Sequence, residues 1–160
     1  MSTRIKKLFS LLLWYLPVVC VQLLSAHVTI GSIDPWYKSL AKASWTPPAW
    51  AFGPAWTLLY IMMTIAVWII CHKQVEKRQR YLAYALFFSQ LIINGLWSFL
   101  FFGAHMTGLA LIDLGLLILL VGLTGLHFFR INSVAGLLFV PYFLWILYAF
   151  SLNAAIYSLN

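Results

Sequence analysis

The feature that most limits the fold of this chain is the near absence of charge from its long apolar stretches. Between Tyr81 and Phe129 the only Asp, Glu, Lys or Arg is Asp113. About 20 apolar residues suffice for a helix to cross a hydrocarbon core of about 30 Å. With 64% apolar and 8% charged residues, the chain also lies far outside the composition of soluble domains. We therefore expect a membrane protein.

Five apolar stretches predict five transmembrane helices, at residues 8–28, 49–71, 81–102, 107–129 and 134–157. The first stretch is longer than the apolar part of a typical signal peptide and is counted as a helix. The remaining residues leave no room for an extramembrane domain. The sequence thus predicts an all-α, polytopic membrane protein, with residues 1–160 forming a single five-helix transmembrane domain.

The basic residues predict the orientation of this bundle. Five crossings place the N-terminus, residues 72–80 and Arg130 on one side, and residues 29–48 and the C-terminus on the other. All lysines and arginines except Lys38 and Lys42 lie on the first side. The positive-inside rule then predicts a cytoplasmic N-terminus, with the C-terminus and the loop 29–48 outside. The net charge of +7 concerns orientation and anionic lipid, and nucleic acid is not an expected partner.

Conventional catalysis and metal binding have few residues to work with here. The four histidines are scattered over four segments, and neither cysteine belongs to a CxxC pair, so no metal site or cofactor is expected. Phosphate-binding glycine loops, nucleophile elbows and paired carboxylates are absent, and only three residues are acidic. A binding protein is therefore favoured over an enzyme.

Aromatic side chains concentrate where the loop 29–48 meets the second predicted helix. Four of the eight tryptophans lie there: Trp36, Trp45, Trp50 and Trp56. Tryptophan at a membrane boundary is typical of an aromatic belt. Large flat rings that each carry one N–H donor also suit a planar, mostly apolar ligand. Both interpretations are open at this point.

Side chains deep in the predicted bilayer favour the ligand interpretation. Buried polar groups in lipid need a partner, either a neighbouring helix or a ligand. Trp145 lies near the midplane of the fifth helix, far from a belt position. The helical period places related residues on shared faces: Gln90, Asn94 and Trp97 on the third helix, Trp145, Ala149 and Leu152 or Asn153 on the fifth, and Trp56, Tyr60 and Met63 on the second.

The fourth predicted helix carries one charge and one smooth stripe. Asp113 would cost about 2.5 to 3.5 kcal/mol in the membrane unless it is paired or neutral, and a structural hydrogen bond is the favoured interpretation. Gly108, Gly115 and Gly122 recur every seven residues. They predict close packing, either against a helix of the same chain or against a second protomer.

Several motifs occur in a fixed order along the chain. They are Trp36-Tyr37, Ser44-Trp45-x-Pro47-Pro48, Gly53-Pro54-x-Trp56-x-x-Leu59-Tyr60, Gln90-Leu91-x-x-Asn94-x-x-Trp97, Ala110-Leu111-x-Asp113, Pro141-Tyr142-x-x-Trp145 and Ala149-x-x-Leu152-Asn153. This set resembles the tryptophan-rich sensory protein and mitochondrial translocator protein family, also called peripheral benzodiazepine receptors. The resemblance covers residues 36–153, and its specificity comes from the order of many motifs.

The resemblance implies a five-helix protein, commonly a homodimer, that binds porphyrins, haem, sterols and synthetic isoquinoline or benzodiazepine ligands in a cavity closed by the first loop. Mapped onto this sequence, it implies a cavity lined by Trp36, Trp45, Trp50, Trp56, Asn94, Trp97, Trp145, Ala149 and Leu152, to which the face of the second helix adds Tyr60. The Leu-x-Tyr-x-Arg cholesterol pattern of animal members is missing, which disfavours sterol transport. Leu109 stands where some members carry a tryptophan.

The expected function is therefore that of a membrane receptor or transporter for porphyrins and related hydrophobic ligands. One alternative is a light-dependent porphyrin-degrading activity in which Trp56 and Trp145 act as electron donors. Sterol or lipid binding is another. No sequence motif separates these possibilities.

Overall fold

The structure is a computed structural model that describes residues 3–160, with side chains from Ile5 onward. It has the long helices α1 (Thr3–Ser32), α2 (Phe52–Cys71), α3 (Lys77–Ser98), α4 (Thr107–Ile131) and α6 (Val140–Leu159), with a short α5 (Ser133–Leu137). Short helical segments η1 (Ile33–Tyr37), η2 (Ala49–Ala51) and η3 (Phe99–Gly103) extend or precede them. Five spans are long and apolar enough to cross a membrane. The predicted five-helix bundle is confirmed.

Local chemistry explains where the first and fifth spans differ from the predicted ranges. The first helix continues to Ser32, and the chain then bends at Asp34 (φ −124°, ψ 127°), because a residue before proline disfavours helical geometry. The fifth span is divided into α5 and α6. Asn132 is extended and caps α5 by accepting a hydrogen bond from the backbone N–H of Ala135 (3.1 Å). Pro141 lies in the first turn of α6, where its missing N–H costs little.

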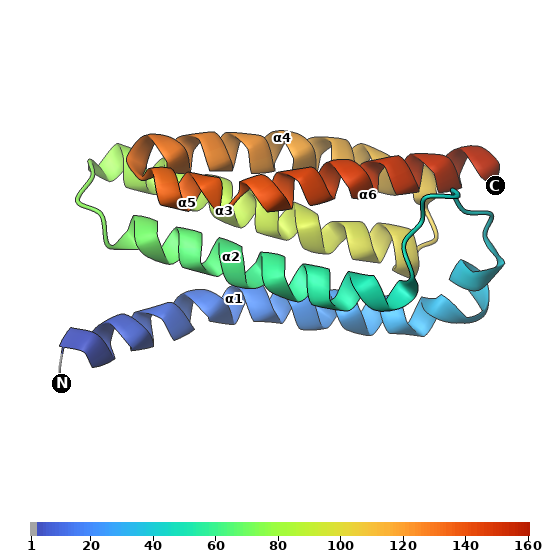
Figure 1. The fold of residues 1–160 in the computed structure, drawn as a ribbon, viewed down its shortest axis with the longest axis horizontal. Helices are drawn as coiled ribbons and strands as arrows, with labels where there is room; N and C mark the ends of the chain where they lie inside the picture. The colour runs from blue at the N-terminus through green and yellow to red at the C-terminus, as the bar shows by residue number, and fades with distance from the viewer. Residues whose placement is uncertain (1–2) are drawn as a thin grey trace.

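Figure 1 shows α1 and α2 along one side of the bundle and α4 and α6 along the other, with α3 between them. Helix α1 packs on α2 and α3 only at the edge of the bundle, and Val18 and Ser25 are its buried residues within the described part. Trp14 and Val21 are partly buried against the core, whereas most leucines of α1, for example Leu12 and Leu23, are exposed, as expected for contact with lipid. The first loop runs from the end of α1 past the C-terminal end of α6 to the start of α2 (Figure 1).

The glycine stripe of α4 packs against α6 of the same chain. A Cβ added to each glycine would lie 2.9, 4.0 and 3.4 Å from the nearest ring atom, in the pairs Gly108–Tyr157, Gly115–Phe150 and Gly122–Phe143. The aromatic residues of α6 therefore recur with the same seven-residue period as the glycines. The glycine stripe is therefore covered by α6. Of the two predicted kinds of packing, against a helix of the same chain or against a second protomer, the structure shows the first.

Candidate ligand-binding site

A chain of buried polar side chains links α2, α3 and α6. Tyr60 Oη donates to Asn94 Oδ1 (2.7 Å), Asn94 Nδ2 donates to Tyr142 Oη (2.8 Å), and Tyr142 Oη donates to Gln90 Oε1 (3.1 Å). All four residues are buried. Lipid cannot form hydrogen bonds with these side chains, so they must bond to one another. This polar chain of side chains therefore fixes the three helices in one register. Gln90 Nε2 is buried and has no hydrogen-bond partner among the described residues.

Aromatic rings from α2 and α6 lie directly beside this polar chain. The Trp56 ring is stacked on Tyr60 with centroids 5.5 Å apart, and its neighbours Tyr142 (6.3 Å) and Trp145 (6.4 Å, 87° between planes) are turned edge-on to it. Phe52 also contacts Trp145 edge-on, with ring centroids 6.0 Å apart. We call these five residues the aromatic site. Trp145 Nε1 is buried without a hydrogen-bond partner in the described chain, so this residue of the aromatic site has an N–H donor without an acceptor.

A second aromatic cluster lies at the C-terminal end of α3. Trp97 stacks on Phe101 (5.1 Å, 24°), and Phe101 contacts Trp36 edge-on (5.5 Å). Trp36 in turn stacks on His105 at 3.9 Å with only 7° between the ring planes. The indole N–H of Trp97 donates to Asn153 Oδ1 (3.1 Å). Trp36 thereby joins the start of the first loop to the turn between α3 and α4.

The first loop is held against the end of α6 by side-chain hydrogen bonds. Tyr148 Oη donates to the carbonyl of Trp45 (2.7 Å). The side-chain amide of Asn160 accepts from the N–H of Ala41 (3.0 Å) and donates to its carbonyl (3.1 Å). Between these two attachments the loop and α6 enclose an open groove of about 580 Å³. The loop is thus fastened over the end of the bundle at two separate points.

Residues 13–159 match the TspO/MBR family. The chain belongs to this family. It is 41% identical to the tryptophan-rich protein TspO of Archaeoglobus fulgidus over 91% of this chain and 93% of the relative. It is 36% identical to protein CrtK of Rhodobacter capsulatus over 94% of each chain. It is 32% identical to the translocator protein of Sus scrofa over 86% of this chain and 82% of the relative.

Membership in the TspO/MBR family makes this chain a multi-pass membrane protein of the receptor or transporter kind, as the sequence predicts. The individual lining residues expected from the family resemblance stay predictions, but their positions are known. Trp56, Tyr60 and Trp145 meet in the aromatic site, with Asn94 bonded to it, while Trp36 and Trp97 meet in the second cluster. Trp45 and Trp50 are 55% and 76% exposed, Ala149 is half-buried and Leu152 is buried.

Two groups of residues contribute polar side chains to this part of the TspO/MBR fold without having been predicted from the sequence. Tyr142 joins both the polar chain and the aromatic site, and its position three residues before Trp145 could have revealed it, since the two share a helix face. On α1, Gln22 donates to Thr57 Oγ1 (3.2 Å), yet Gln22 Oε1 and Ser25 Oγ are buried without partners in the described chain. Gln22 and Ser25 are three residues apart, so the helical period could have placed both polar side chains on one face of α1.

Asp113 differs from its favoured interpretation. Its side chain is buried in α4, but Oδ2 has no hydrogen-bond partner among residues 3–160. The structural hydrogen bond expected for this carboxyl group is therefore not seen at that oxygen. Asp113 is also not part of the polar chain formed by Tyr60, Asn94, Tyr142 and Gln90.

Proposed function

We propose that this TspO/MBR family member is a receptor or transporter that binds a porphyrin or a similar planar hydrophobic ligand at the aromatic site, beneath the first loop. The observation that carries the proposal is the unpartnered Nε1 of Trp145 beside the flat ring of Trp56. A large apolar ring system with an acceptor at its edge can stack beside Trp56 and accept a hydrogen bond from Trp145. No cofactor is needed, since the porphyrin or haem is the ligand.

The perpendicular indoles suggest how such a ligand is held. A macrocycle stacked on Trp56 meets Trp145 edge-on, so one indole provides apolar contact area and the other provides a hydrogen bond. Apolar surface supplies most of the affinity, and few polar groups set the orientation. Asn94 acts through Tyr60 and Tyr142, to which its amide is already bonded. The rings are in mutual contact, so the ligand has to enter with a movement of Trp145 or of the first loop.

Tryptophan fluorescence titration with a porphyrin, a sterol and an isoquinoline ligand tests the proposal. Trp145→Phe keeps a ring but removes the N–H, and should weaken porphyrin binding about 2- to 10-fold, the equivalent of about 0.5 to 1.4 kcal/mol. The control is Trp68→Phe, because Trp68 Nε1 donates to the Lys7 carbonyl (3.2 Å) near the opposite end of α2. Equal porphyrin affinity for wild type and Trp145→Phe contradicts the assigned role.

A light-dependent degradation of bound porphyrin is a second candidate function. It is favoured by one observation, the edge contact of two oxidisable indoles at a centroid distance of 6.4 Å. If Trp56 and Trp145 donate electrons, Trp56→Phe and Trp145→Phe should slow porphyrin loss under light at saturating porphyrin, while binding is largely kept. Equal bleaching rates for wild type and both variants would leave a receptor or transporter.

The same proposal includes the orientation and the homodimer expected from the sequence. The basic end of the bundle would face the cytoplasm, with the first loop and the C-terminus outside. Because the glycine stripe of α4 is occupied by α6, a second copy would use another outward face. Cross-linking of single-cysteine variants, one on each outward face of the bundle, in native membranes would locate that face.

A further inference from the structure

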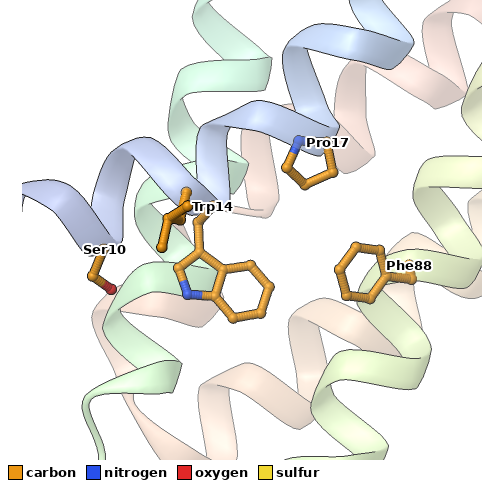
Figure 2. A pocket seen from close by; sticks show the side chains of 5 residues that line it. Ser10, Trp14, Pro17 and Phe88 are labelled. Atoms are coloured by element: carbon orange, nitrogen blue, oxygen red, sulfur yellow. The ribbon is translucent and has the colours of Figure 1, made fainter.

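A notch lies between α1 and α3, on the outer surface of the bundle and away from the aromatic site. Its volume is about 330 Å³. Figure 2 shows the rings of Trp14 and Phe88 side by side in its lining, with Pro17 toward one end and Ser10 toward the other. Leu13 completes the lining. The walls are mostly apolar, with the Ser10 hydroxyl and the Trp14 indole nitrogen as polar groups, so the notch suits a hydrocarbon chain.

The walls of the notch are built before any ligand arrives. The Trp14 ring packs on Tyr84 (5.0 Å), Phe87 (6.2 Å) and Phe88 (6.1 Å), which holds the indole against α3. Leu13 remains 55% exposed at the rim. A preformed apolar notch loses little conformational entropy on binding. In a membrane, its rim opens toward lipid.

Helix α1 continues the notch toward a pair of cations. Lys6 and Lys7 precede Ser10 by four and three residues, so they share its helix face and lie about 6 Å farther along the axis. Lys7 and Pro17 are ten residues apart, or about 15 Å, which is half of a hydrocarbon core of about 30 Å. The stripe from the lysines to Pro17 therefore has the depth of one leaflet.

Helix α3 brings a third cation to the same end. Val21 lies against Gly95 and Val28 against Gly103, with added Cβ distances of 3.1 and 3.2 Å, so α1 and α3 run parallel and both begin at the basic end. Lys77 precedes Phe88 by eleven residues, close to three full turns, and thus shares its face. The mouth of the notch is basic on both sides.

We propose that this notch binds an anionic phospholipid of the leaflet at the basic end. One acyl chain lies along the notch, against Leu13, Trp14 and Phe88, and the phosphate lies near Lys6, Lys7 and Lys77. Basic pockets between transmembrane helices are suited to anionic headgroups. A zwitterionic lipid offers the same chain without net attraction to the lysines. This site is separate from the aromatic site and does not depend on the function proposed there.

The test is lipid binding to the purified full chain in detergent, measured by native mass spectrometry. The probes are phosphatidylglycerol and phosphatidylcholine with identical acyl chains. Wild type should bind phosphatidylglycerol at least 5-fold more tightly. Lys7→Gln should lower that preference to about 2-fold or less, while Arg130→Gln, on α4 at the same end, should keep it. Equal affinities of wild type for both lipids, or equal losses in the two variants, would overturn the proposal.

A second pair of variants tests the chain-binding part. Leu13→Trp fills the notch and should weaken binding of both lipids at least 5-fold. Leu12→Trp is the matched control, because Leu12 is exposed on α1 (59%) but does not line the notch. Circular dichroism verifies that each variant is folded. Equal lipid binding by the two variants refutes the notch as the chain site. Equal thermal stabilisation by inorganic phosphate alone and by phosphatidylglycerol would show that a free anion, and not a lipid, is recognised.

Discussion

Asn94→Leu is expected to destabilise the bundle, because Asn94 holds the centre of the polar chain. Its amide accepts from Tyr60 and donates to Tyr142, and both bonds connect different helices. Leucine has nearly the same size, so the packing around position 94 changes little. What the substitution removes is two interhelical hydrogen bonds. It also leaves the Tyr60 hydroxyl, on a buried residue, without its acceptor.

The magnitude follows from the number of bonds lost. An interhelical hydrogen bond in a membrane protein contributes about 0.6 kcal/mol on average and up to about 1.7 kcal/mol. Two such bonds give about 1 to 3 kcal/mol, and the stranded Tyr60 hydroxyl places the expectation in the upper half of that range. Tyr60→Phe removes one of the two bonds together with its donor, and should cost about 0.6 to 1.7 kcal/mol.

Unfolding by a denaturing detergent, followed by circular dichroism, measures these free energies. The double variant Asn94→Leu/Tyr60→Phe should cost less than the sum of the single variants, because both remove the same hydrogen bond. Thr64→Val is the control. The Thr64 hydroxyl is also buried, but it bonds to the Tyr60 carbonyl within α2 (2.8 Å) and joins no second helix. Its removal should cost less than either change in the polar chain.

Two results would refute this reasoning. If Asn94→Leu unfolds at the same detergent concentration as wild type, the polar chain does not stabilise the bundle. If the single-variant losses add fully in the double variant, Tyr60 and Asn94 act independently, contrary to the 2.7 Å hydrogen bond between them.

Three further predictions concern packing, the first loop and orientation. Gly136→Ala should lower the free energy of unfolding by about 2 kcal/mol or more, because a Cβ there would lie 2.5 Å from Phe129 Cα. Gly115→Ala should change it by less than about 0.5 kcal/mol, since the nearest atom to its Cβ would be 4.0 Å away. Thermal unfolding compares the two variants. Tyr148→Phe and Asn160→Ala should each speed hydrogen exchange in residues 41–45, while exchange within α2 stays unchanged. A reporter fused after Asn160 should lie outside and one inserted at residues 73–76 in the cytoplasm, and the reverse labelling pattern would refute the assigned orientation.

The pairing of tryptophans shows why part of the candidate site could be anticipated. Trp145 stands out in the sequence because an indole near a bilayer midplane is unusual, and the structure brings it against Trp56. Trp97 shares a helix face with Asn94, yet it packs on Phe101 and bonds to Asn153 instead of joining the aromatic site. A helical period defines a face, but it does not say which part of the face meets which neighbour.

The sequence by itself determined the five spans, their depth in the membrane and the asymmetry of charge between the two ends. These properties depend on how each residue partitions between water and lipid, which is a local quantity. Only the tertiary structure decided that the glycines of α4 meet the aromatic residues of α6, that Tyr142 connects Asn94 to Gln90, and that Asn160 fastens Ala41. Such pairings depend on which helices become neighbours, because lipid outside and side chains inside are equally apolar and hydropathy does not distinguish them.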